Sequence, residues 1–349
     1  MKTVLITGGA GFIGSNLVEY LHDKYNYKVE YLHDKYNYKI VVLDCLTYAG
    51  NITNLRKVWD SPRFEFIHGN ICNASLVDEL VSRSDMIVHL ATESYVTRSI
   101  HDNFTFFMTD VLGTQILCNS ICKHKNVQRF IHVSTSEVYG TAWELPMGED
   151  HPLQPMNPRA AAKCGADRLV HSYWRTYGIP AIILRLFNNY GPRQHLGKVI
   201  PRFITSVILN EPIRIHGDGK AARDYVHVDD TCRAIDLVLH HKEPLAGGEF
   251  NVGSGLPTSL NLLAATIKLI LEKPKHPIEH TGDRPGQVKM HKADCTYLWA
   301  NTKWKTEIEL DKGLQRTVYW YLNNRDWWEP QLWLREIPII TADGRKEMH

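Results

Sequence analysis

Three glycines near the N-terminus have the spacing of a loop that binds a dinucleotide. Residues 7–14 read Thr-Gly-Gly-Ala-Gly-Phe-Ile-Gly, follow the apolar run Val4–Ile6 and precede a helical pattern. Glycines in this context allow a tight turn and let backbone N–H groups approach a pyrophosphate at the helix N-terminus. Asp44 ends the next apolar run and is the carboxylate expected at the adenosine ribose. No arginine stands beside it, which favours NAD over NADP because a carboxylate would repel a 2′-phosphate.

The distance from the glycines to this carboxylate is lengthened by a tandem repeat. Residues 18–28 recur unchanged as residues 29–39. Asp44 follows Gly14 by 30 positions, and removal of one 11-residue copy leaves 19, close to the roughly 20 that such motifs have. Two copies do not make a solenoid, which needs several units. We interpret the repeat as a recent or engineered duplication that either lengthens the first helix or loops out on the surface.

A second set of reactive side chains follows the fifth apolar run. Arg129–Val133 leads into Ser134-Thr135-Ser136-Glu137, and parallel α/β sheets bind their ligands at this carboxyl edge. The next predicted helix carries Arg159 and Lys163 four residues apart, hence on one face. Because a guanidinium is always charged, Arg159 cannot act as a general base.

The elements that position these groups are predicted from short apolar runs that alternate with longer helical segments. Such runs, flanked by Gly, Asp or Ser, are typical of parallel strands buried on both faces. We therefore expect a doubly wound parallel α/β sheet, a Rossmann domain, over residues 1–188. Prolines and glycine-rich turns after residue 188 indicate a smaller substrate-binding region in 189–349, with segments that return to the first domain. The expected strands lie at residues 4–6, 40–43, 64–67, 86–90, 129–133 and 181–184.

Composition excludes several classes of protein. The 349 residues are 44% hydrophobic and 22% charged, with a net charge of +2 and no basic segment, so a nucleic-acid binder is not expected. No stretch reaches 18 apolar residues and no signal peptide is visible, which predicts a cytoplasmic protein without a membrane segment. Seven scattered cysteines without a CxxC pair indicate reduced thiols and no zinc site. His89, His132 and His227 lie in apolar runs and are expected in the core.

Taken together, the glycine motif, Ser134–Gly140 and Asn157–Lys163 resemble the extended short-chain dehydrogenase/reductases that act on nucleotide sugars. The resemblance covers nearly the whole chain apart from the repeat and the C-terminal tail. Asp44–Asn51 and Glu93–Ile100 are most similar to the dTDP-glucose 4,6-dehydratases, which usually have His at Tyr95. Those enzymes carry Asp-Glu where this chain has Ser136-Glu137. The latter pair resembles GDP-mannose 4,6-dehydratases, and a similar Ser-Glu stretch occurs in UDP-glucuronate decarboxylases.

The resemblance implies an internal redox reaction on a hexose. In the family, a tyrosinate takes the proton of the 4-OH while hydride passes from C4 to NAD. A glutamate then takes the C5 proton, the 6-OH leaves as water, and hydride returns to C6. This pattern makes Thr135 the ligand of the 4-OH and Glu137 the C5 base, and it puts Ser136 in the position of the acid.

The catalytic tyrosine of the family's YxxxK pattern is missing. Arg159 stands in its place, whereas Lys163 remains. We therefore expect weak redox activity or none, since loss of such a base costs about 10²–10⁴-fold in rate. Tyr139 and Tyr190 are the candidates for a substitute base, although packing roles are favoured for both.

The resemblance also implies binding residues and a homodimer. Asn70 stands where the family usually has Asp, and Asp110 replaces the usual Asn of a helix beside the cofactor. Predicted helices at 103–125 and 160–177 are those that pair across a homodimer in the family. The implied NAD ligands are Gly8, Gly11, Phe12, Ile13, Gly14, Asp44, Asn70, Ile71, Leu90, Ala91, Lys163 and Asn188. The implied ligands of the nucleotide-diphosphate sugar are Ser94, Asn189, Lys198, Arg223 and Arg284.

Three functions remain open on the sequence. The first is an NAD-dependent nucleotide-sugar 4,6-dehydratase that forms a 4-keto-6-deoxy sugar, impaired by Arg159. The second is a 4-epimerase or decarboxylase on the same scaffold, which Glu137 and residues 44–51 disfavour. The third is a non-catalytic sugar-nucleotide binding protein, which Arg159 favours. Neither the nucleotide nor the sugar follows from the motifs.

Overall fold

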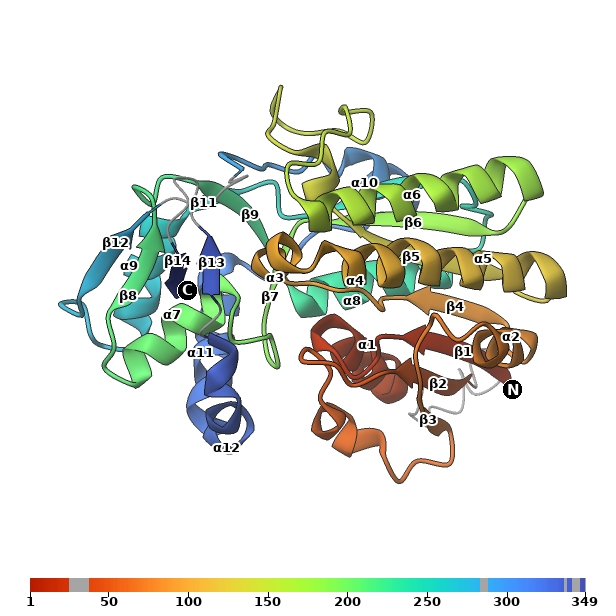
Figure 1. The fold of residues 1–349 in the computed structure, drawn as a ribbon, viewed down its shortest axis with the longest axis horizontal. Coiled ribbons are helices and arrows are strands. Elements are labelled where there is room, and N and C mark those ends of the chain that lie inside the picture. The colour runs from red at the N-terminus through yellow and green to blue at the C-terminus, as the bar shows by residue number, and fades with distance from the viewer. Residues whose placement is uncertain (25–37, 283–287, 336–337, 341–345, 349) are drawn as a thin grey trace.

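A seven-stranded parallel sheet forms the larger lobe of the molecule (Figure 1). The computed structural model describes residues 1–24, 38–282, 288–335, 338–340 and 346–348. The strand order β3-β2-β1-β4-β5-β6 is that of dinucleotide-binding folds, which confirms the predicted Rossmann sheet, and β10 adds a seventh strand beside β6. The strands are β1 (Lys2–Thr7), β2 (Tyr38–Asp44), β3 (Phe64–His68), β4 (Met86–His89), β5 (Arg129–Thr135), β6 (Ala181–Leu186) and β10 (Glu249–Val252).

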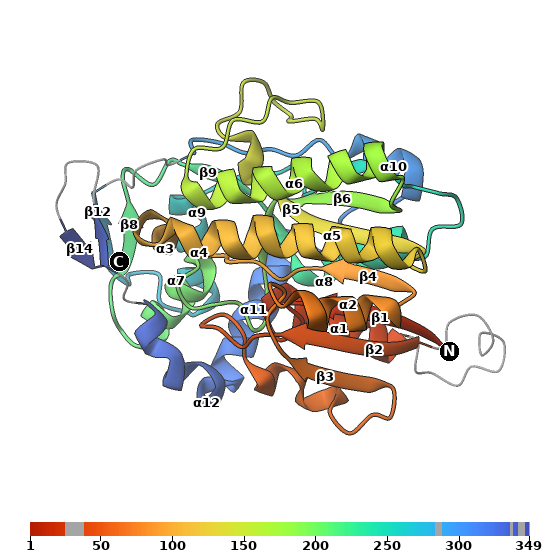
Figure 2. The same ribbon diagram turned by 45° about the vertical axis from the view of Figure 1, so that its right-hand side comes forward.

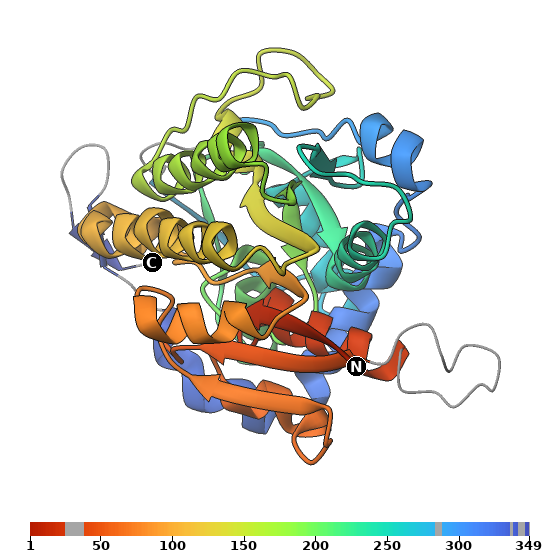
Figure 3. The same cartoon turned by 90° about the vertical axis from the view of Figure 1, so that its right-hand side faces the viewer.

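Helices cover both faces of this sheet, as Figure 3 shows. One face carries α1 (Phe12–Lys24) and α8 (Val228–Leu239), and the other carries α2 (Ala74–Ser82), α5 (Gly113–His124) and α6 (Pro158–Tyr177). Successive strand residues point to opposite faces: Val4 and Ile6 pack toward α1 and α8, whereas Leu5 packs on the other side. The strands therefore read as continuous apolar runs.

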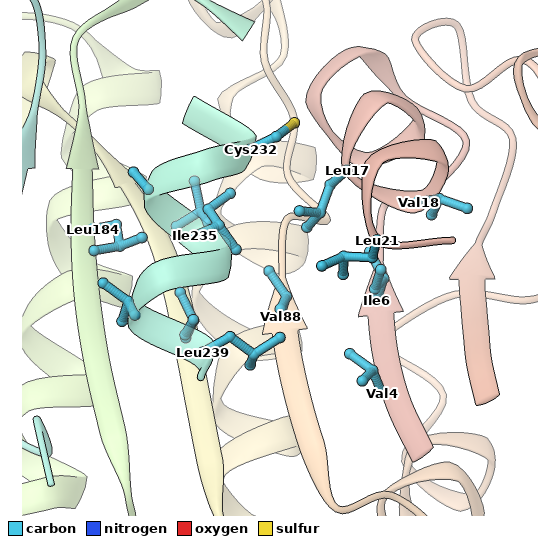
Figure 4. Packing of buried hydrophobic residues seen from close by; sticks show 14 of the residues in the cluster. Val4, Ile6, Leu17, Val18, Leu21, Val88, Leu184, Cys232, Ile235 and Leu239 are labelled. Carbon is cyan, nitrogen blue, oxygen red and sulfur yellow. The ribbon is translucent and has the colours of Figure 1, made fainter. Parts of the chain in front are cut away.

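The packing between α1, α8 and the sheet is dense (Figure 4). Leu17 and Leu21 of α1 lie beside β1, and Ile235 of α8 lies over the sheet between Val88 and Leu184; all three side chains are 0–3% exposed. Each such side chain stabilises the fold by about 1.5–3 kcal/mol relative to an exposed position. Since α8 lies far along the sequence, the first lobe is complete only when the chain returns to it.

The smaller lobe holds two short sheets and their helices, on the left in Figure 1. Its own apolar cluster includes Ile204, Ile215, Leu263 and Trp328, all buried. The elements are β7 (Asn188–Tyr190), β9 (Ala222–His227) and β11 (Pro257–Ser259) in one sheet, β8 (Ile213–His216) and β12 (Ile278–Thr281) in the other, and α7 (Val199–Ile208), α9 (Leu260–Ile270), α11 (Leu310–Asn323) and α12 (Arg325–Trp328). The last strands, β13 (Pro338–Ile340) and β14 (Lys346–Met348), pair with each other.

The helix predicted for residues 103–125 is interrupted. Figure 2 shows α3 (Val96–His101), α4 (Asn103–Phe107) and α5 following one another along the molecule. A π-helical turn, η2 (Met108–Leu112), joins α4 to α5 and contains Asp110. The other short helices are η1 (Ile52–Val58), η3 (Ser136–Tyr139), α10 (Thr296–Thr302) and η4 (Glu329–Arg335).

The repeat spans the junction of α1 and β2. Residues 18–24 of the first copy lie in α1, which ends at Lys24, and residues 38–39 of the second copy begin β2. Whether the first helix continues beyond Lys24 depends on residues 25–37 and stays a prediction. The alternative of a looped-out copy concerns residues 25–37, which lie outside the described residues.

Candidate active site

A cleft lies at the carboxyl edge of the parallel sheet, where β1, β2, β4, β5 and β6 end. Its lining includes the glycine loop, the end of β5, the start of α6 and the β7–α7 segment of the smaller lobe. The structure thus brings together residues that lie far apart in the chain, from Gly8 of the glycine loop to Tyr225 of β9. All twelve residues predicted to bind NAD line this one cleft: Gly8, Gly11, Phe12, Ile13, Gly14, Asp44, Asn70, Ile71, Leu90, Ala91, Lys163 and Asn188.

The glycine loop leaves no room for side chains at two of its positions. Gly8 has a φ of +72°, and a Cβ there would lie 2.7 Å from the Ala91 backbone nitrogen. A Cβ on Gly14 would lie 2.2 Å from the Gly8 carbonyl oxygen. At Gly11 a Cβ would meet only backbone oxygens, at 3.3 and 3.9 Å, where the loop faces the cleft. The loop and the N-terminus of α1 therefore form a backbone cradle that fits a pyrophosphate.

Asp44 closes the far side of this cradle. Its Oδ2 accepts a hydrogen bond from the Ala10 N–H at 2.9 Å, and its Oδ1 accepts one from the Leu46 N–H at 2.8 Å. Burial raises the pKa of Asp44, and these two hydrogen bonds oppose the rise. Each carboxylate oxygen can accept more than one hydrogen bond, so the group remains able to receive ribose hydroxyls.

The register of α6 is set by its first residues. Asn157 caps the helix by accepting a hydrogen bond from the Ala160 N–H at 2.9 Å, and Pro158 occupies the first turn, where its missing N–H costs nothing. This start aims Lys163 beneath β5, where its Nζ donates to the Val133 carbonyl at 2.7 Å. Thr135 ends the same strand, and its hydroxyl accepts from the Glu137 N–H at 3.3 Å.

Arg159 forms an ion pair with Glu137 inside the cleft. Its Nη1 lies 3.1 Å from Glu137 Oε2, and the two side chains are 13% and 24% exposed. Asn157 Nδ2 lies 3.5 Å from the same carboxylate oxygen. Burial alone would raise the pKa of Glu137, but Arg159 and Lys198, with His291 and Arg223, lower it to about 2. The carboxylate is therefore ionised at neutral pH and is a weaker base than an unpaired glutamate.

Lys163 and Asp110 compensate each other's charge. Burial lowers the pKa of Lys163, an effect that Asp110 opposes. Burial likewise raises the pKa of Asp110, and Lys163 opposes that rise. The π turn aims Asp110 inward, where its Oδ1 accepts from the Glu93 N–H at 3.1 Å. The Asp at this position thus places a negative charge beside the two cations of α6.

Ser136 does not face the cleft. It is 1% exposed, and its hydroxyl lies 3.2 Å from His291 Nδ1. His291 Nε2 donates to the Gly140 carbonyl at 2.8 Å, which leaves Nδ1 to accept the serine proton. Burial and nearby Arg223 lower the pKa of His291 to about 4, so the imidazole is neutral. The sequence-based placement of Ser136 in the acid position therefore finds no support in the geometry, and His291, an isolated histidine in the sequence, gave no signal of this contact.

The two tyrosines considered as substitute bases lie outside the cleft lining. The Tyr139 hydroxyl donates to Asn251 Oδ1 at 2.8 Å and accepts from Arg185 at 3.0 Å. The Tyr190 hydroxyl lies 3.4 Å from the Leu310 carbonyl. Both side chains are buried and burial raises both pKa values, as expected of packing residues. Among the described residues that line the cleft, the one tyrosine is Tyr225 of β9.

The residues predicted for the sugar nucleotide lie on the side of the smaller lobe. Ser94, Asn189 and Lys198 line the cleft, and Lys198 Nζ donates to the Ser94 carbonyl at 2.6 Å. Arg223 lines an adjoining cavity that shares Lys198 and Glu137 with the cleft. Arg284 lies outside the described residues. Sequence reasoning missed three further basic side chains of that cavity, Arg202, Arg214 and His216.

Neither a metal-binding cluster nor a membrane-spanning helix occurs in the part of the chain that the structure describes. No three His, Cys, Asp or Glu side chains within it converge on a position that would hold a metal ion. Within the same ranges, every helix is too short or too polar to cross a lipid bilayer.

Comparison with known proteins finds close relatives along most of the chain. The family described as GDP-mannose 4,6 dehydratase matches residues 5–317. A dTDP-glucose 4,6-dehydratase of Streptomyces niveus is 38% identical over 327 residues, which are 94% of this chain and 95% of the relative. The low-salt glycan biosynthesis protein Agl12 of Haloferax volcanii is 41% identical over 324 residues, 92% of this chain and 99% of the relative.

Solved structures agree with these relatives. DesIV, a dTDP-glucose 4,6-dehydratase of Streptomyces venezuelae crystallised with NAD, has a TM-score of 0.88 at 39% identity and covers 94% of this chain and 99% of its own. A UDP-glucuronic acid 4-epimerase of Bacillus cereus, in complex with UDP-glucuronic acid and NAD, has a TM-score of 0.84 at 28% identity, over 92% and 99% of the two chains. The resemblance to sugar-nucleotide enzymes that use NAD is thus confirmed. Because the family match runs through both lobes and the cleft between them, the chain belongs to the GDP-mannose 4,6 dehydratase family.

Proposed function

We propose that this protein is an NAD-dependent nucleotide-sugar 4,6-dehydratase whose catalytic power is reduced by Arg159. The observation that carries the proposal is the convergence of Thr135, Glu137 and Lys163 with the glycine loop in a single cleft. Basic side chains of the adjoining cavity complement a diphosphate. The relatives named dTDP-glucose 4,6-dehydratase favour dTDP-glucose as the first substrate to test.

The chain supplies the groups that hold the reactants and move protons. The glycine loop, Asp44 and the apolar wall of Ile71 and Leu90 would hold NAD, which when bound would supply the hydride acceptor and donor for the sugar. Thr135 donates to or accepts from the sugar 4-OH, and Lys163 places a positive charge beneath the reacting end of the sheet. Glu137, ionised at neutral pH, removes the C5 proton and, once protonated, delivers it to the leaving 6-OH. The proton of the 4-OH passes to solvent water, and C5 takes a proton from solvent when hydride is added at C6.

Arg159 weakens two of these steps. A guanidinium cannot take the proton of the 4-OH as a tyrosinate would. The same guanidinium also holds the Glu137 carboxylate at 3.1 Å and lowers its basicity. Both the oxidation at C4 and the proton abstraction at C5 are therefore slowed, because each lacks an effective base.

This ion pair favours one alternative, a protein that binds a sugar nucleotide without converting it. The glycine loop, Asp44 and the cations of the smaller lobe suffice for binding. In such a protein Arg159 and Glu137 would serve as polar contacts to the sugar. Retention of NAD and substrate without product would identify this case.

The assembly and the compartment of the protein form a second part of the proposal. We infer a homodimer formed through α5 and α6, which pack side by side on one face of the sheet with Phe104, Phe107 and Tyr177 exposed near their ends. All seven cysteines are free thiols, in keeping with a cytoplasmic, reducing environment.

The test is mass spectrometry of four sugar nucleotides after incubation with NAD and either this chain or Arg159→Tyr. The substrates are dTDP-glucose, GDP-mannose, UDP-glucose and UDP-N-acetylglucosamine. We expect the tyrosine variant to remove one water from one of them and the unaltered chain to do so slowly or not at all. An isomer of unchanged mass would instead indicate epimerisation, and binding without any product from either protein would contradict a dehydratase.

A further inference from the structure

Strand β7 and the loop that follows it carry three polar atoms that are unpartnered within the described ranges, all in residues that line the cleft. They are Asn189 Oδ1, Gln194 Oε1 and His195 Nε2, which are buried and have no hydrogen-bond partner among the described residues. Buried polar atoms are almost always paired in folded proteins. Three such atoms within seven consecutive residues, all in residues that line a ligand cleft, indicate that a ligand completes their hydrogen bonds.

The orientation of both amides follows from their other contacts. Asn189 Nδ2 donates to the Phe187 carbonyl at 3.0 Å, and Gln194 Nε2 donates to the Asn189 carbonyl at 2.7 Å. A carbonyl partner requires the NH₂ group on that side, so Asn189 Oδ1 and Gln194 Oε1 are the open acceptors.

The proton of His195 is fixed in the same way. The Gly197 backbone N–H donates to Nδ1 at 3.0 Å, so Nδ1 is an acceptor and the proton of the neutral ring lies on Nε2. Burial, together with Lys198 and Arg98, lowers the pKa of His195 to about 3. The imidazole is therefore a neutral N–H donor throughout the physiological range.

Two tyrosines hold this ring in place. The imidazole centroid lies 5.5 Å from that of Tyr48, with the planes at 89°, and 5.5 Å from that of Tyr95, with the planes at 37°. Tyr95 stands where the dTDP-glucose 4,6-dehydratases usually have His, and in this chain its ring lies beside His195. A ring fixed between two aromatic side chains loses little freedom when it binds a ligand.

We propose that His195 donates its Nε2–H to a hydroxyl of the hexose and thereby helps to select the sugar. This inference rests on the proposed function and adds a residue that none of the sequence motifs indicated. A neutral donor is suited to a neutral hydroxyl, whereas the phosphates have Lys198 and Arg223 nearby. Gln194 Oε1 offers an acceptor on the same loop for a neighbouring hydroxyl.

The experiment compares three ligands on the full-length chain by isothermal titration calorimetry. The first ligand is the sugar nucleotide that the unaltered chain binds best, with dTDP-glucose as the first candidate. The second is the corresponding nucleoside diphosphate, and the third is NAD. His195→Phe keeps an aromatic ring between the two tyrosines but removes the donor. We expect its affinity for the sugar nucleotide to fall about 10- to 100-fold, with affinities for the diphosphate and NAD within about twofold of the unaltered chain.

Two variants separate this role from a structural one. His195→Gln retains an N–H donor and is expected to recover part of the lost affinity. His22→Phe makes the same chemical change at a buried imidazole in α1, outside the cleft, whose Nε2 also has no partner in the described ranges. It should leave all three affinities unchanged.

Each remaining outcome overturns the inference. An unchanged affinity of His195→Phe for the sugar nucleotide would show that the donor is not used. An equal loss for the sugar nucleotide and the diphosphate would assign the donor to phosphate, and a loss for NAD alone would assign it to the cofactor. If the unaltered chain binds no sugar nucleotide, the proposed function itself fails, which this first measurement reveals before any variant is made.

Discussion

Arg159 places a permanently charged guanidinium where the family has a tyrosine, whose hydroxyl can lose its proton. The consequence can be measured in the dependence of activity on pH. In Arg159→Tyr the main cation beside Glu137 is gone, so the pKa of that carboxyl should rise from about 2 toward its ordinary value near 4.5. We expect kcat/KM for dehydration to increase at least about 10²-fold at neutral pH. Activity of the variant should then be lost as pH falls through the raised pKa. Initial rates of 4-keto sugar formation between pH 4 and 8 provide the test.

Arg159→Met is the matched control. It removes the charge without adding a phenol, so the pKa of Glu137 should rise while the base for the 4-OH stays absent. Equal rates for the Met and Tyr variants would contradict the assignment of this position to proton transfer from the 4-OH.

For single residues, the sequence indicated which reactive side chains belong to the cleft better than it indicated the contacts that these side chains make. Thr135, Glu137 and Lys163 could be placed because each belongs to a local motif at the end of β5 or in the first turns of α6. The contacts of Ser136 with His291 and of His195 with Tyr48 and Tyr95 join residues from separate parts of the chain. No local spacing carries that information, so only the folded structure shows it.

Among the elements, α1 and β2 need only one copy of the repeat. The first copy supplies residues 18–24 to α1, and the second supplies Tyr38 and Lys39 to β2. A single copy contains both sets, with Tyr-Asn between them as a two-residue connection, a length that helix-to-strand loops commonly have. The repeated sequence is therefore redundant for this helix and this strand.

We expect a chain that lacks residues 27–37 to fold and to bind NAD as the full chain does. Shortening a loop changes the closure entropy by only about 0.6 kcal/mol for each halving of its length. The connection between Lys24 and Tyr38 shortens from 13 residues to two, which is between two and three halvings. The free energy of unfolding in urea should therefore change by less than about 2 kcal/mol, with NAD affinity unchanged in calorimetry. An insoluble deletion variant, or one that no longer binds NAD, would show that both copies are required.

The elements were predicted well where periodicity is strong and poorly where a local distortion intervenes. All six predicted strands are present because buried parallel strands read as apolar runs. The π turn at Asp110 was not foreseen, since one extra residue in a helical turn leaves the apolar pattern almost unchanged.

For the whole molecule, four buried histidines predict a steep loss of stability in mild acid. Burial lowers the pKa of His89 and His195 to about 3 and that of His291 to about 4, and holds the pKa of His132 well below its ordinary value. The unfolded chain takes up these protons near pH 6.5. The contribution of these four neutral histidines to the free energy of unfolding is therefore fully present above pH 6.5. It falls as pH decreases from 6.5 to about 4, by at most about 1.4 kcal/mol per pH unit for each histidine.

Urea unfolding between pH 7.5 and 5 measures this slope, and His132→Leu isolates one contribution. Neither ring nitrogen of His132 has a partner among the described residues, so the substitution should cost little at pH 7.5 while it flattens the slope by about 1.4 kcal/mol per pH unit. A slope that is the same in both proteins would contradict the prediction. The lowered pKa of Glu137 also stabilises the fold, but this contribution is lost only as pH falls below about 4.5. It therefore does not change the slope measured between pH 7.5 and 5.

The return of α8 and β10 to the larger lobe also constrains how this protein can evolve. A crossover at residue 188 would exchange α8 and β10 together with the substrate side, because both come later in the chain although they pack on the sheet. A foreign helix would then have to match Val4, Val88 and Leu184 side chain by side chain. The two lobes of this chain are therefore poor units of recombination. If His195 selects the sugar as proposed, single substitutions in the β7–α7 loop are a simpler route to a new sugar preference than the exchange of a whole lobe.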